Sequence, residues 1–321
     1  MMMNEPRHFT PPVTALRGQW EAHVSMARHV SWRAGGAARR TYTPADLEDL
    51  AAMLAQLPQE EPVLFAGLGS NLLVRDGGYP GTVVLLHAAL SALRVESLPD
   101  HGELIYAEAG VASPKVARFA ANLGADAAFM AGIPGTVGGA LAMNAGCYGA
   151  ETWPCVVQVC TIDRQGRRHL RQPADFDIGY RHVMSREASA QGEVFAAAWF
   201  RFPAQEKEVA RETIRTLLEK RVASQPLRLP NAGSVFRNPP GDFAARLIES
   251  IGLKGLRIGG AEVSTQHANF IVNHDGSATA ADIETLITTV QDRVAAATGV
   301  QLIREVRIVG NAASSSSRSE A

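Results

Sequence analysis

The stretch that decides the fold is a run of glycines near the middle of the chain. It reads Gly132-Ile133-Pro134-Gly135-Thr136-Val137-Gly138-Gly139-Ala140 and is soon followed by Met143-Asn144-Ala145-Gly146-Cys147-Tyr148-Gly149. Each glycine costs backbone entropy on folding, so turn chemistry alone explains so many of them poorly. Close approach of the main chain to a ligand, with several amides donating to an anionic group, is the economical explanation. A buried crossing of two backbones is the alternative.

A second glycine turn, Gly67-Leu68-Gly69-Ser70-Asn71, follows the apolar run Val63–Ala66. Its beginning matches a dinucleotide fingerprint, but Leu72 stands where G-x-G-x-x-G requires glycine, and the Gly-Lys-Ser/Thr of a P-loop is absent. Such a turn can still aim amides and a serine hydroxyl at a phosphate, although a purely structural turn is the alternative. Two runs of this kind favour a dinucleotide that contains a pyrophosphate.

Outward from these runs, hydrophobic periodicity predicts several short strands and four helices. The strands are predicted at Val63–Ala66, Thr82–Leu86, Leu104–Ala107, Val156–Ile162 and Val194–Phe202, with Asp163–Gly166 as a hairpin turn towards His169. The first helix is predicted to have Thr43 as its N-cap, followed by Pro44 and Asp46, and the second to run from Ser113-Pro114 to Gly124. The third is predicted over residues 205–222, and the fourth begins at a cap formed by Thr279 and Asp282. Because strands and helices do not alternate strictly, an α+β fold is predicted rather than a doubly wound sheet.

The helix at 205–222 is the best candidate for a domain junction. It is charged on its outer face, and its predicted inner face consists of Val209, Ile214, Leu217 and Leu218. The chain has 321 residues, which at about 150 residues per domain suggests two or three domains. A junction near residue 205 divides the chain accordingly.

Charge and composition exclude several classes of partner. The 31 basic and 32 acidic residues balance, so no electrostatic argument favours nucleic acid or an anionic membrane. We expect neither a signal peptide nor a membrane helix, because the first residues contain no apolar run of seven or more and no stretch approaches the roughly 20 apolar residues of a membrane helix. Three cysteines without a CxxC pattern fit a reducing compartment, and nine scattered histidines suggest no metal site. We expect a cytoplasmic protein without a metal and without an obligate protein partner.

The glycine runs belong to a longer series of motifs. Gly67–Asn71, the GIPGTVGG run with Met143–Gly146, and Pro230–Pro239 (PNAGSVFRNP) occur in this order between residues 31 and 310. Together they resemble UDP-N-acetylenolpyruvoylglucosamine reductase, a flavoprotein family of peptidoglycan precursor synthesis. Each motif alone is weak, but the motifs in this order are highly specific. The resemblance runs from Ser31–Gly36 to Glu305–Gly310, which is nearly the whole chain outside the tails.

The resemblance implies an FAD-binding domain of the vanillyl-alcohol-oxidase (PCMH) type over 16–204, in two α+β subdomains of about 16–80 and 81–204. A smaller α+β substrate domain would cover 205–310. Composition, rather than the resemblance, predicts disordered ends, because residues 1–15 are aperiodic and residues 311–321 form a Ser-rich polar tail. FAD would be held non-covalently, with NADPH as co-substrate. The implied FAD contacts are Gly67, Gly69, Ser70, Asn71, Gly132, Ile133, Pro134, Gly135, Thr136, Gly138, Gly139, Asn144 and Gly146.

The implied reaction reduces the enolpyruvyl ether of UDP-N-acetylglucosamine enolpyruvate to the lactyl ether of UDP-N-acetylmuramate. A hydride passes from NADPH to FAD and from flavin N5 to C3, which leaves negative charge over C2 and the carboxylate. This charge needs a cation, and C2 needs a proton source. By its match to the family, Arg181 would be the cation, Ser234 the proton donor, and Glu305 the carboxylate that assists enol formation.

A further set of residues is implied to contact the nucleotide-sugar substrate. Arginine and asparagine suit its carboxylate and diphosphate, although they could equally cap local structure. The candidates are Tyr148, Tyr180, Arg221, Arg237, Asn238, Gln266 and His267.

The chain departs from the family pattern in two places. Val183 stands where the family usually has a serine two residues after the arginine, and only Ser185 could replace that hydroxyl, through a loop shift. No tyrosine follows Tyr180, so the chain resembles the type that lacks an extra tyrosine-bearing loop, and Tyr148 remains as an aromatic candidate.

Two other functions compete with this hypothesis. One is an FAD-dependent oxidase of a small alcohol or sugar on the same fold, which would not require Ser234 or Glu305. The other is a nucleotide-binding module without catalysis, which would not be expected to retain Arg181, Ser234 and Glu305 together.

Overall fold

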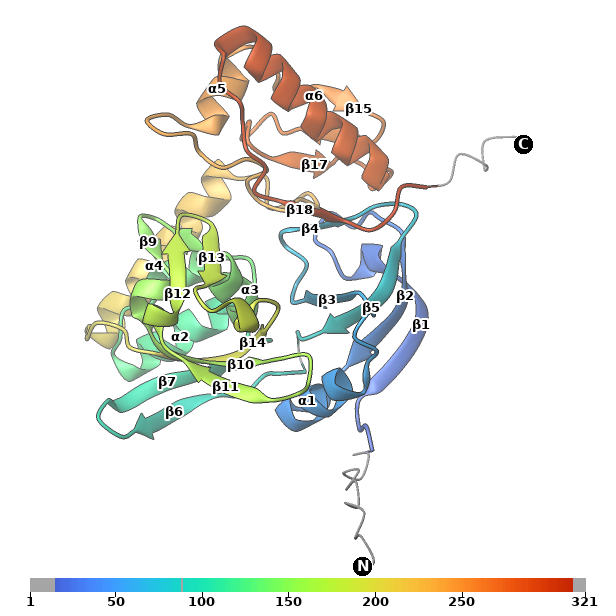
Figure 1. Cartoon of the computed structure of the whole chain (residues 1–321). Coiled ribbons are helices and arrows are strands. Elements are labelled where there is room, and N and C mark those ends of the chain that lie inside the picture. The colour runs from blue at the N-terminus through green and yellow to red at the C-terminus, as the bar shows by residue number, and fades with distance from the viewer. Residues whose placement is uncertain (1–14, 88, 314–321) are drawn as a thin grey trace, which may run out of the picture.

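The structure, a computed structural model, describes residues 15–87 and 89–313. The ends predicted to be disordered, 1–15 and 311–321, lie almost entirely outside the described residues. The start of the C-terminal stretch is held by hydrogen bonds, because Asn311 N donates to Gly78 O (2.9 Å) and Gly77 N donates to Asn311 O (3.0 Å). Figure 1 shows three parts: a first subdomain (15–87), a second subdomain (89–224) and a third domain (225–313).

The first subdomain is a four-stranded sheet in the order β1-β2-β5-β3, in which β5 runs parallel to both neighbours. Its elements are β1 Gln19–Ser25, η1 Met26–Arg28, β2 Ala37–Thr43, α1 Leu47–Gln56, β3 Val63–Ala66, β4 Leu72–Val74 and β5 Tyr79–Leu85. The predicted cap of α1 at Thr43 is wrong. Thr43 ends β2, and the Asp46 carboxylate instead accepts from Asp49 N at 2.9 Å.

The second subdomain is a five-stranded antiparallel sheet in the order β11-β10-β14-β7-β6. Its strands are β6 Leu93–Leu98, β7 Gly102–Glu108, β8 Gly146–Cys147, β9 Ala150–Glu151, β10 Val156–Ile162, β11 Arg168–Arg171, β12 Phe176–Gly179, β13 His182–Ser185 and β14 Val194–Phe200. Its helices are α2 Ser113–Leu123, η2 Ala128–Gly132, α3 Val137–Ala142, η3 Trp153–Cys155, η4 Pro173–Asp175, η5 Ala188–Ala190 and α4 Lys207–Ser224. The predicted hairpin between β10 and β11 and the left-handed glycine stop of α2 at Gly124 are confirmed.

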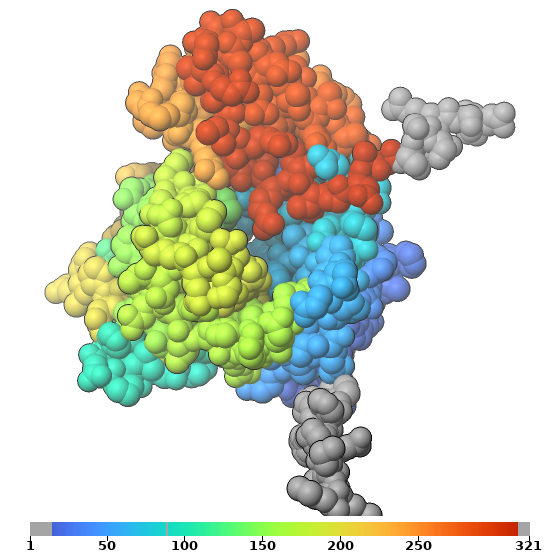
Figure 2. All heavy atoms as spheres, viewed as in Figure 1, coloured from blue at the N-terminus to red at the C-terminus, as the bar shows by residue number. Residues whose placement is uncertain are grey.

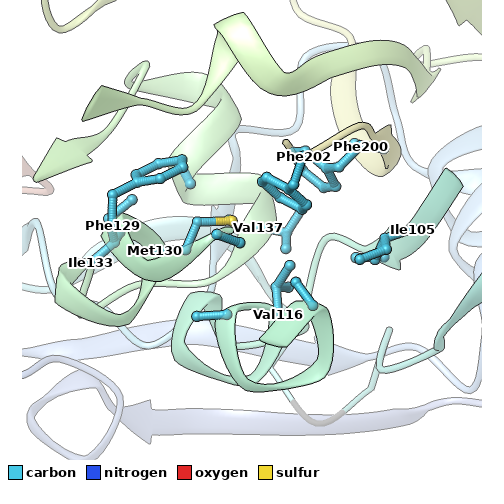
Figure 3. Close-up of a cluster of buried hydrophobic side chains, with 14 of the residues drawn as sticks. Ile105, Val116, Phe129, Met130, Ile133, Val137, Phe200 and Phe202 are labelled. Atoms are coloured by element: carbon cyan, nitrogen blue, oxygen red, sulfur yellow. The ribbon is translucent and has the colours of Figure 1, made fainter. Parts of the chain in front are cut away.

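Helix α4 belongs to the second subdomain rather than to the third domain. Ala210 and Ile214 of α4 are buried in the same hydrophobic cluster as α2, η2 and β14. Figure 3 shows the centre of this cluster, where side chains of β7, α2, η2, α3 and the end of β14 meet. Val209, predicted to face inward, is 45% exposed, because Ala210 takes the buried position. The chain therefore enters the third domain after α4 and not at residue 205.

The third domain packs α6 against a small antiparallel sheet in the order β15-β16-β17, and α5 packs against α6. Its elements are α5 Ala244–Ser250, β15 Arg257–Ile258, β16 Ala261–Val263, β17 Ile271–Asn273, α6 Ala280–Thr298 and β18 Arg307–Val309. The capping box of Thr279 and Asp282 at the start of α6 is confirmed. The α+β class predicted from the sequence is confirmed by these mixed sheets and helices.

The third domain is joined to the first subdomain by a strand and a buried tryptophan. Strand β18 pairs in parallel with β4, with Arg307 opposite Leu72. The indole Nε1 of Trp32 donates to Ile271 O at 2.8 Å, and Asn273 Nδ2 donates to Trp32 O at 3.0 Å. The last strand of the chain thus returns to the second glycine turn, Gly67–Asn71.

Candidate active site

A cavity of about 730 Å³ lies where the three parts of the molecule meet. Figure 2 shows the hollow between the blue first subdomain, the yellow-green second subdomain and the red third domain. Both glycine runs, the β12–β13 hairpin, the last turn of α4 and the segment around Ser234 line it. Its volume is in the range of small-molecule and cofactor sites.

The cavity wall brings the two glycine runs together. All predicted cofactor residues except Asn144 line it. A Cβ at Gly135 would meet nothing closer than Ser70 Oγ at 3.4 Å, and a Cβ at Gly139 nothing closer than Thr136 Oγ1 at 4.0 Å. Packing within the protein therefore does not require glycine at these two positions. Free space above bare main chain fits a ligand that the backbone approaches closely, as expected for the phosphates of FAD.

Asn144 has other partners, although it was predicted to contact the cofactor. Its side chain is buried, and Nδ2 donates to Glu151 Oε2 (2.8 Å) and Gly179 O (3.2 Å). Its Oδ1 accepts from Trp153 N at 3.2 Å. Both donor hydrogens are used within the protein, so the side chain has none left for a cofactor.

Arg181 lies at the tip of the β12–β13 hairpin, with a left-handed φ of +55°. Its Nε donates to Glu305 Oε1 at 2.7 Å. Nη1 donates to Asn144 O (3.2 Å) and Nη2 to Gly146 O (3.3 Å). A guanidinium has five N–H donors, so two remain for a ligand in the cavity that Arg181 lines.

Glu305 and Ser234 come together through two extended segments. Glu305 N donates to Val235 O at 2.8 Å, which places Ser234 beside the start of this contact. Burial raises the pKa of Glu305, and the neighbouring Arg181 and Arg237 oppose that rise. Among the described residues nothing binds the Ser234 hydroxyl, and Ser234 lines the cavity. The hydroxyl is therefore free to meet a ligand.

The predicted substrate residues divide into two groups. Tyr180, Arg221 and Asn238 line the cavity, whereas Tyr148, Arg237, Gln266 and His267 do not. Arg221 donates through Nε to Gln225 Oε1 at 2.8 Å, and burial lowers its pKa. Asn238 Oδ1 also accepts from Ala244 N at 3.1 Å.

Three of the residues outside the lining have structural partners. Tyr148 donates to Leu217 O at 2.6 Å, and Gln266 Nε2 donates to the carbonyls of Val222 and Ala223 at the end of α4. His267 Nδ1 accepts from Asn269 N at 3.3 Å, and burial lowers its pKa. A role for these side chains at the substrate stays a prediction.

Val183 lines the cavity at the position where the family usually has a serine. Ser185 does not replace that hydroxyl: it pairs with Phe176 across the hairpin, and its Oγ accepts from Glu187 N at 3.2 Å. Cavity residues that the sequence analysis missed include Cys147, Phe270 and Arg307. The position of Arg307, two residues after Glu305 in an extended segment, was the one available signal.

Within 15–87 and 89–313, no three His, Cys, Asp or Glu side chains group closely enough to hold a metal ion. In the same ranges no helix is both long and apolar enough to cross a membrane.

Two known protein families match different parts of this chain. A family described as "UDP-N-acetylenolpyruvoylglucosamine reductase, C-terminal domain" matches residues 225–309, and one described as "FAD binding domain" matches residues 38–170. The first match begins at the end of α4, where the third domain begins.

Relatives match along most of the chain. The UDP-N-acetylenolpyruvoylglucosamine reductase of Thiobacillus denitrificans is 58% identical over 312 residues, which is 94% of each chain. That of Nitrosomonas eutropha is 56% identical over 300 residues, or 92% of this chain and 90% of the relative. The crystal structure of the reductase from Thermus caldophilus superimposes with a TM-score of 0.75 at 30% identity, covering 92% of this chain and 99% of that one. The chain belongs to the UDP-N-acetylenolpyruvoylglucosamine reductase family.

Proposed function

We propose that Arg181, Ser234 and Glu305 perform the substrate half of the reaction that this chain catalyses as a member of its family. The reaction is the NADPH-dependent, FAD-mediated reduction of UDP-N-acetylglucosamine enolpyruvate to UDP-N-acetylmuramate, in peptidoglycan precursor synthesis. Three segments distant in sequence supply the three side chains to one cavity wall. This convergence is the observation that carries the proposal.

The two glycine runs would hold FAD through their amides. When bound there, FAD would supply the hydride chemistry that links NADPH to C3 of the enolpyruvyl group. Gly67–Asn71 and Gly132–Gly139 lie on the cavity wall with open space above Gly135 and Gly139, which suits the pyrophosphate.

Arg181 stabilises the negative charge that develops on C2 and on the substrate carboxylate. Three of its N–H groups are fixed by Glu305, Asn144 and Gly146, so its two remaining N–H groups have a set direction before substrate binds. Preorganised donors of this kind need little rearrangement during the reaction, which is the main source of electrostatic catalysis. Glu305 orients the guanidinium and assists enol formation.

Ser234 donates the proton to C2. A serine hydroxyl is a weak acid, so it serves only because the developing enolate is strongly basic. Support comes from its place on the cavity wall next to the Val235–Glu305 contact and from the lack of any partner for its hydroxyl among the described residues.

The direct test uses the purified protein with its flavin. Under anaerobic conditions NADPH should bleach the flavin absorbance, and UDP-N-acetylglucosamine enolpyruvate should restore it, with UDP-N-acetylmuramate identified by mass. Neither an alcohol nor a sugar should reduce the flavin. Reduction by an alcohol, or no reoxidation by the enolpyruvyl compound, would contradict the proposal in favour of the oxidase or the non-catalytic module.

The protein is further proposed to work in the cytoplasm and without an obligate protein partner. All side chains that the proposed mechanism uses belong to this one chain. The cysteines Cys147, Cys155 and Cys160 are free, as is usual in a reducing compartment.

A further inference from the structure

Asn144 lies at the junction of three segments around the cavity. It follows α3, is 1% exposed, and has a left-handed φ of +39°, which asparagine tolerates better than most residues. Its side chain bonds to Glu151 of β9, to Gly179 of β12 and to Trp153 of η3. It therefore ties the end of the glycine-rich run to the hairpin that bears Arg181.

Two of the bonds of Asn144 bear directly on Arg181. Gly179 comes immediately before the Tyr180-Arg181 turn, so the Asn144 side chain holds the base of that turn. The Asn144 carbonyl accepts from Arg181 Nη1, so the same residue also holds the guanidinium. The left-handed backbone of Arg181 is unfavourable for a residue with a side chain, so the turn needs such support.

We propose that Asn144 is the positioning residue that orients Arg181 towards the substrate, and that its side chain does not bind the cofactor. The proposal rests on the role of Arg181 proposed above. Arg181 acts on the enolate. Loss of the hydrogen bonds that the Asn144 side chain makes should therefore slow reoxidation of the flavin by substrate, by roughly 10- to 100-fold. Reduction by NADPH and the flavin content should stay near normal.

Two variants test this in the holoenzyme. Asn144→Asp keeps the acceptor for Trp153 N but loses both donors and faces the Glu151 carboxylate. Asn144→Gly removes the side chain, keeps the left-handed backbone without strain, and decides the matter if the aspartate variant does not fold. Flavin content, melting temperature and both half-reactions in anaerobic stopped-flow are measured for each.

Asn273→Asp is the matched control. Asn273 is as deeply buried as Asn144, with Nδ2 donating to Trp32 O (3.0 Å) and Oδ1 accepting from Ala278 N (3.0 Å). The substitution makes the same change from amide to carboxylate, but in a buried hydrogen-bond network that does not include Arg181. Its melting temperature should fall without a selective loss in reoxidation.

A double-mutant cycle shows whether Asn144 acts through Arg181. Asn144→Asp combined with Arg181→Ala should reoxidise no more slowly than Arg181→Ala alone. The positioning role would be overturned by any of three results. These are full additivity of the two substitutions' effects on the reoxidation rate, unchanged reoxidation in the folded Asn144 variants, and loss of flavin from both Asn144 variants. An Arg181→Ala enzyme with a normal reoxidation rate would contradict the proposed function and this inference together, whereas a slow one with normal Asn144 variants contradicts only the inference.

Discussion

Ser234 is a residue whose role can be separated from binding by comparing the two half-reactions. The proton reaches C2 only after hydride transfer to the substrate, so Ser234→Ala should fold, bind FAD and be reduced by NADPH at a near-normal rate. Reoxidation by the enolpyruvyl substrate should slow by at least ~10²–10⁴, the usual contribution of a positioned general acid. Ser234→Cys, which keeps a proton donor, should recover part of the rate. Equal slowing of both half-reactions in anaerobic stopped-flow would make the serine structural.

Valine substitutions at Gly135 and at Gly138 should have different effects, because Gly135 faces the cavity whereas Gly138 packs against Ala109. A valine at Gly135 would extend into the cavity, since its Cβ meets only Ser70 Oγ at 3.4 Å, so flavin content should fall while the fold survives. At Gly138 a Cβ would lie 2.9 Å from Ala109 Cβ, so Gly138→Val should lower the melting temperature as well. The ratio of flavin to protein absorbance, with melting curves, distinguishes them. Full flavin content in Gly135→Val would contradict the phosphate cradle.

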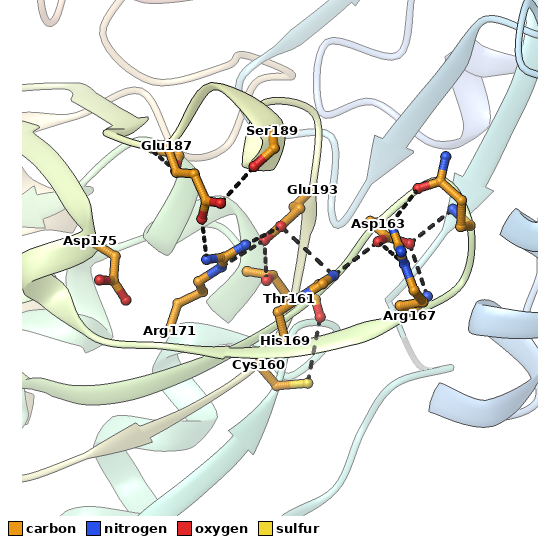
Figure 4. A network of polar contacts seen from close by, with 12 residues as sticks. Cys160, Thr161, Asp163, Arg167, His169, Arg171, Asp175, Glu187, Ser189 and Glu193 are labelled. Atoms are coloured by element: carbon orange, nitrogen blue, oxygen red, sulfur yellow. Dashed lines mark hydrogen bonds and ion pairs between the residues drawn. The ribbon is translucent and has the colours of Figure 1, made fainter.

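At the scale of elements, the β10–β11 hairpin is held by a polar network around its turn (Figure 4). Burial alone would raise the pKa of Asp163, but hydrogen bonds from His169 and from Arg167 outweigh it and hold the pKa at about 2. A carboxylate with a depressed pKa stabilises the fold above its unfolded pKa near 4, and this stabilisation is lost as the pH falls towards 2.

Asp163→Asn should therefore destabilise the protein by about 1–2 kcal/mol at pH 7, and by progressively less below pH 4. The melting temperature at pH 7 and pH 3 measures the difference from the unsubstituted protein. Asp177→Asn on the neighbouring hairpin is the control, because its carboxylate is 66% exposed and, among the described residues, contacts only His182. A loss of the same size at both pH values would show that the Asp163 charge is not responsible.

At the scale of the whole molecule, the first subdomain caps a helix of the third domain. The Asp76 carboxylate accepts from Ala280 N (2.9 Å) and Ala281 N (2.8 Å) at the start of α6. Arg75 adds an ion pair of 2.8 Å to Glu284 of the same helix. These contacts join the first subdomain to α6, and a separate hydrogen bond from Asn71 Nδ2 to Glu305 O (3.2 Å) joins it to the segment that bears Glu305.

Asp76→Ala should cost about 0.5–2 kcal/mol, the usual value of a lost helix cap. Because the third domain would be held less firmly, KM for the nucleotide sugar should rise while flavin content stays constant. Melting curves and steady-state kinetics check both. Asp275→Ala is the control, since within the described part of the chain the Asp275 side chain accepts hydrogen bonds only from Ser277 in its own turn. A variant that loses flavin without a change in KM would contradict the docking role.

Short-range signals in the sequence predicted much of the fold. Strands β3 and β10 begin and end where expected, and α2 and α6 have the predicted glycine stop and capping box. Periodicity, caps and turns depend on neighbours within a few residues, so they can be read locally. The glycine runs line the cavity, and the role of their amides in binding a cofactor stays a prediction.

The assembled site depended on tertiary structure. Arg181 and Glu305 lie 124 residues apart and meet only because β18 returns to the first subdomain. The resemblance to a family suggested both residues. Their 2.7 Å contact and the hydrogen bonds of the Asn144 side chain depend on how the three parts pack. Packing between distant parts of the chain also explains why Gln266 donates to a carbonyl at the end of α4 and why Val209 is exposed. A local pattern fixes which residues form an element, whereas the face that it buries and the partners it meets depend on the rest of the chain.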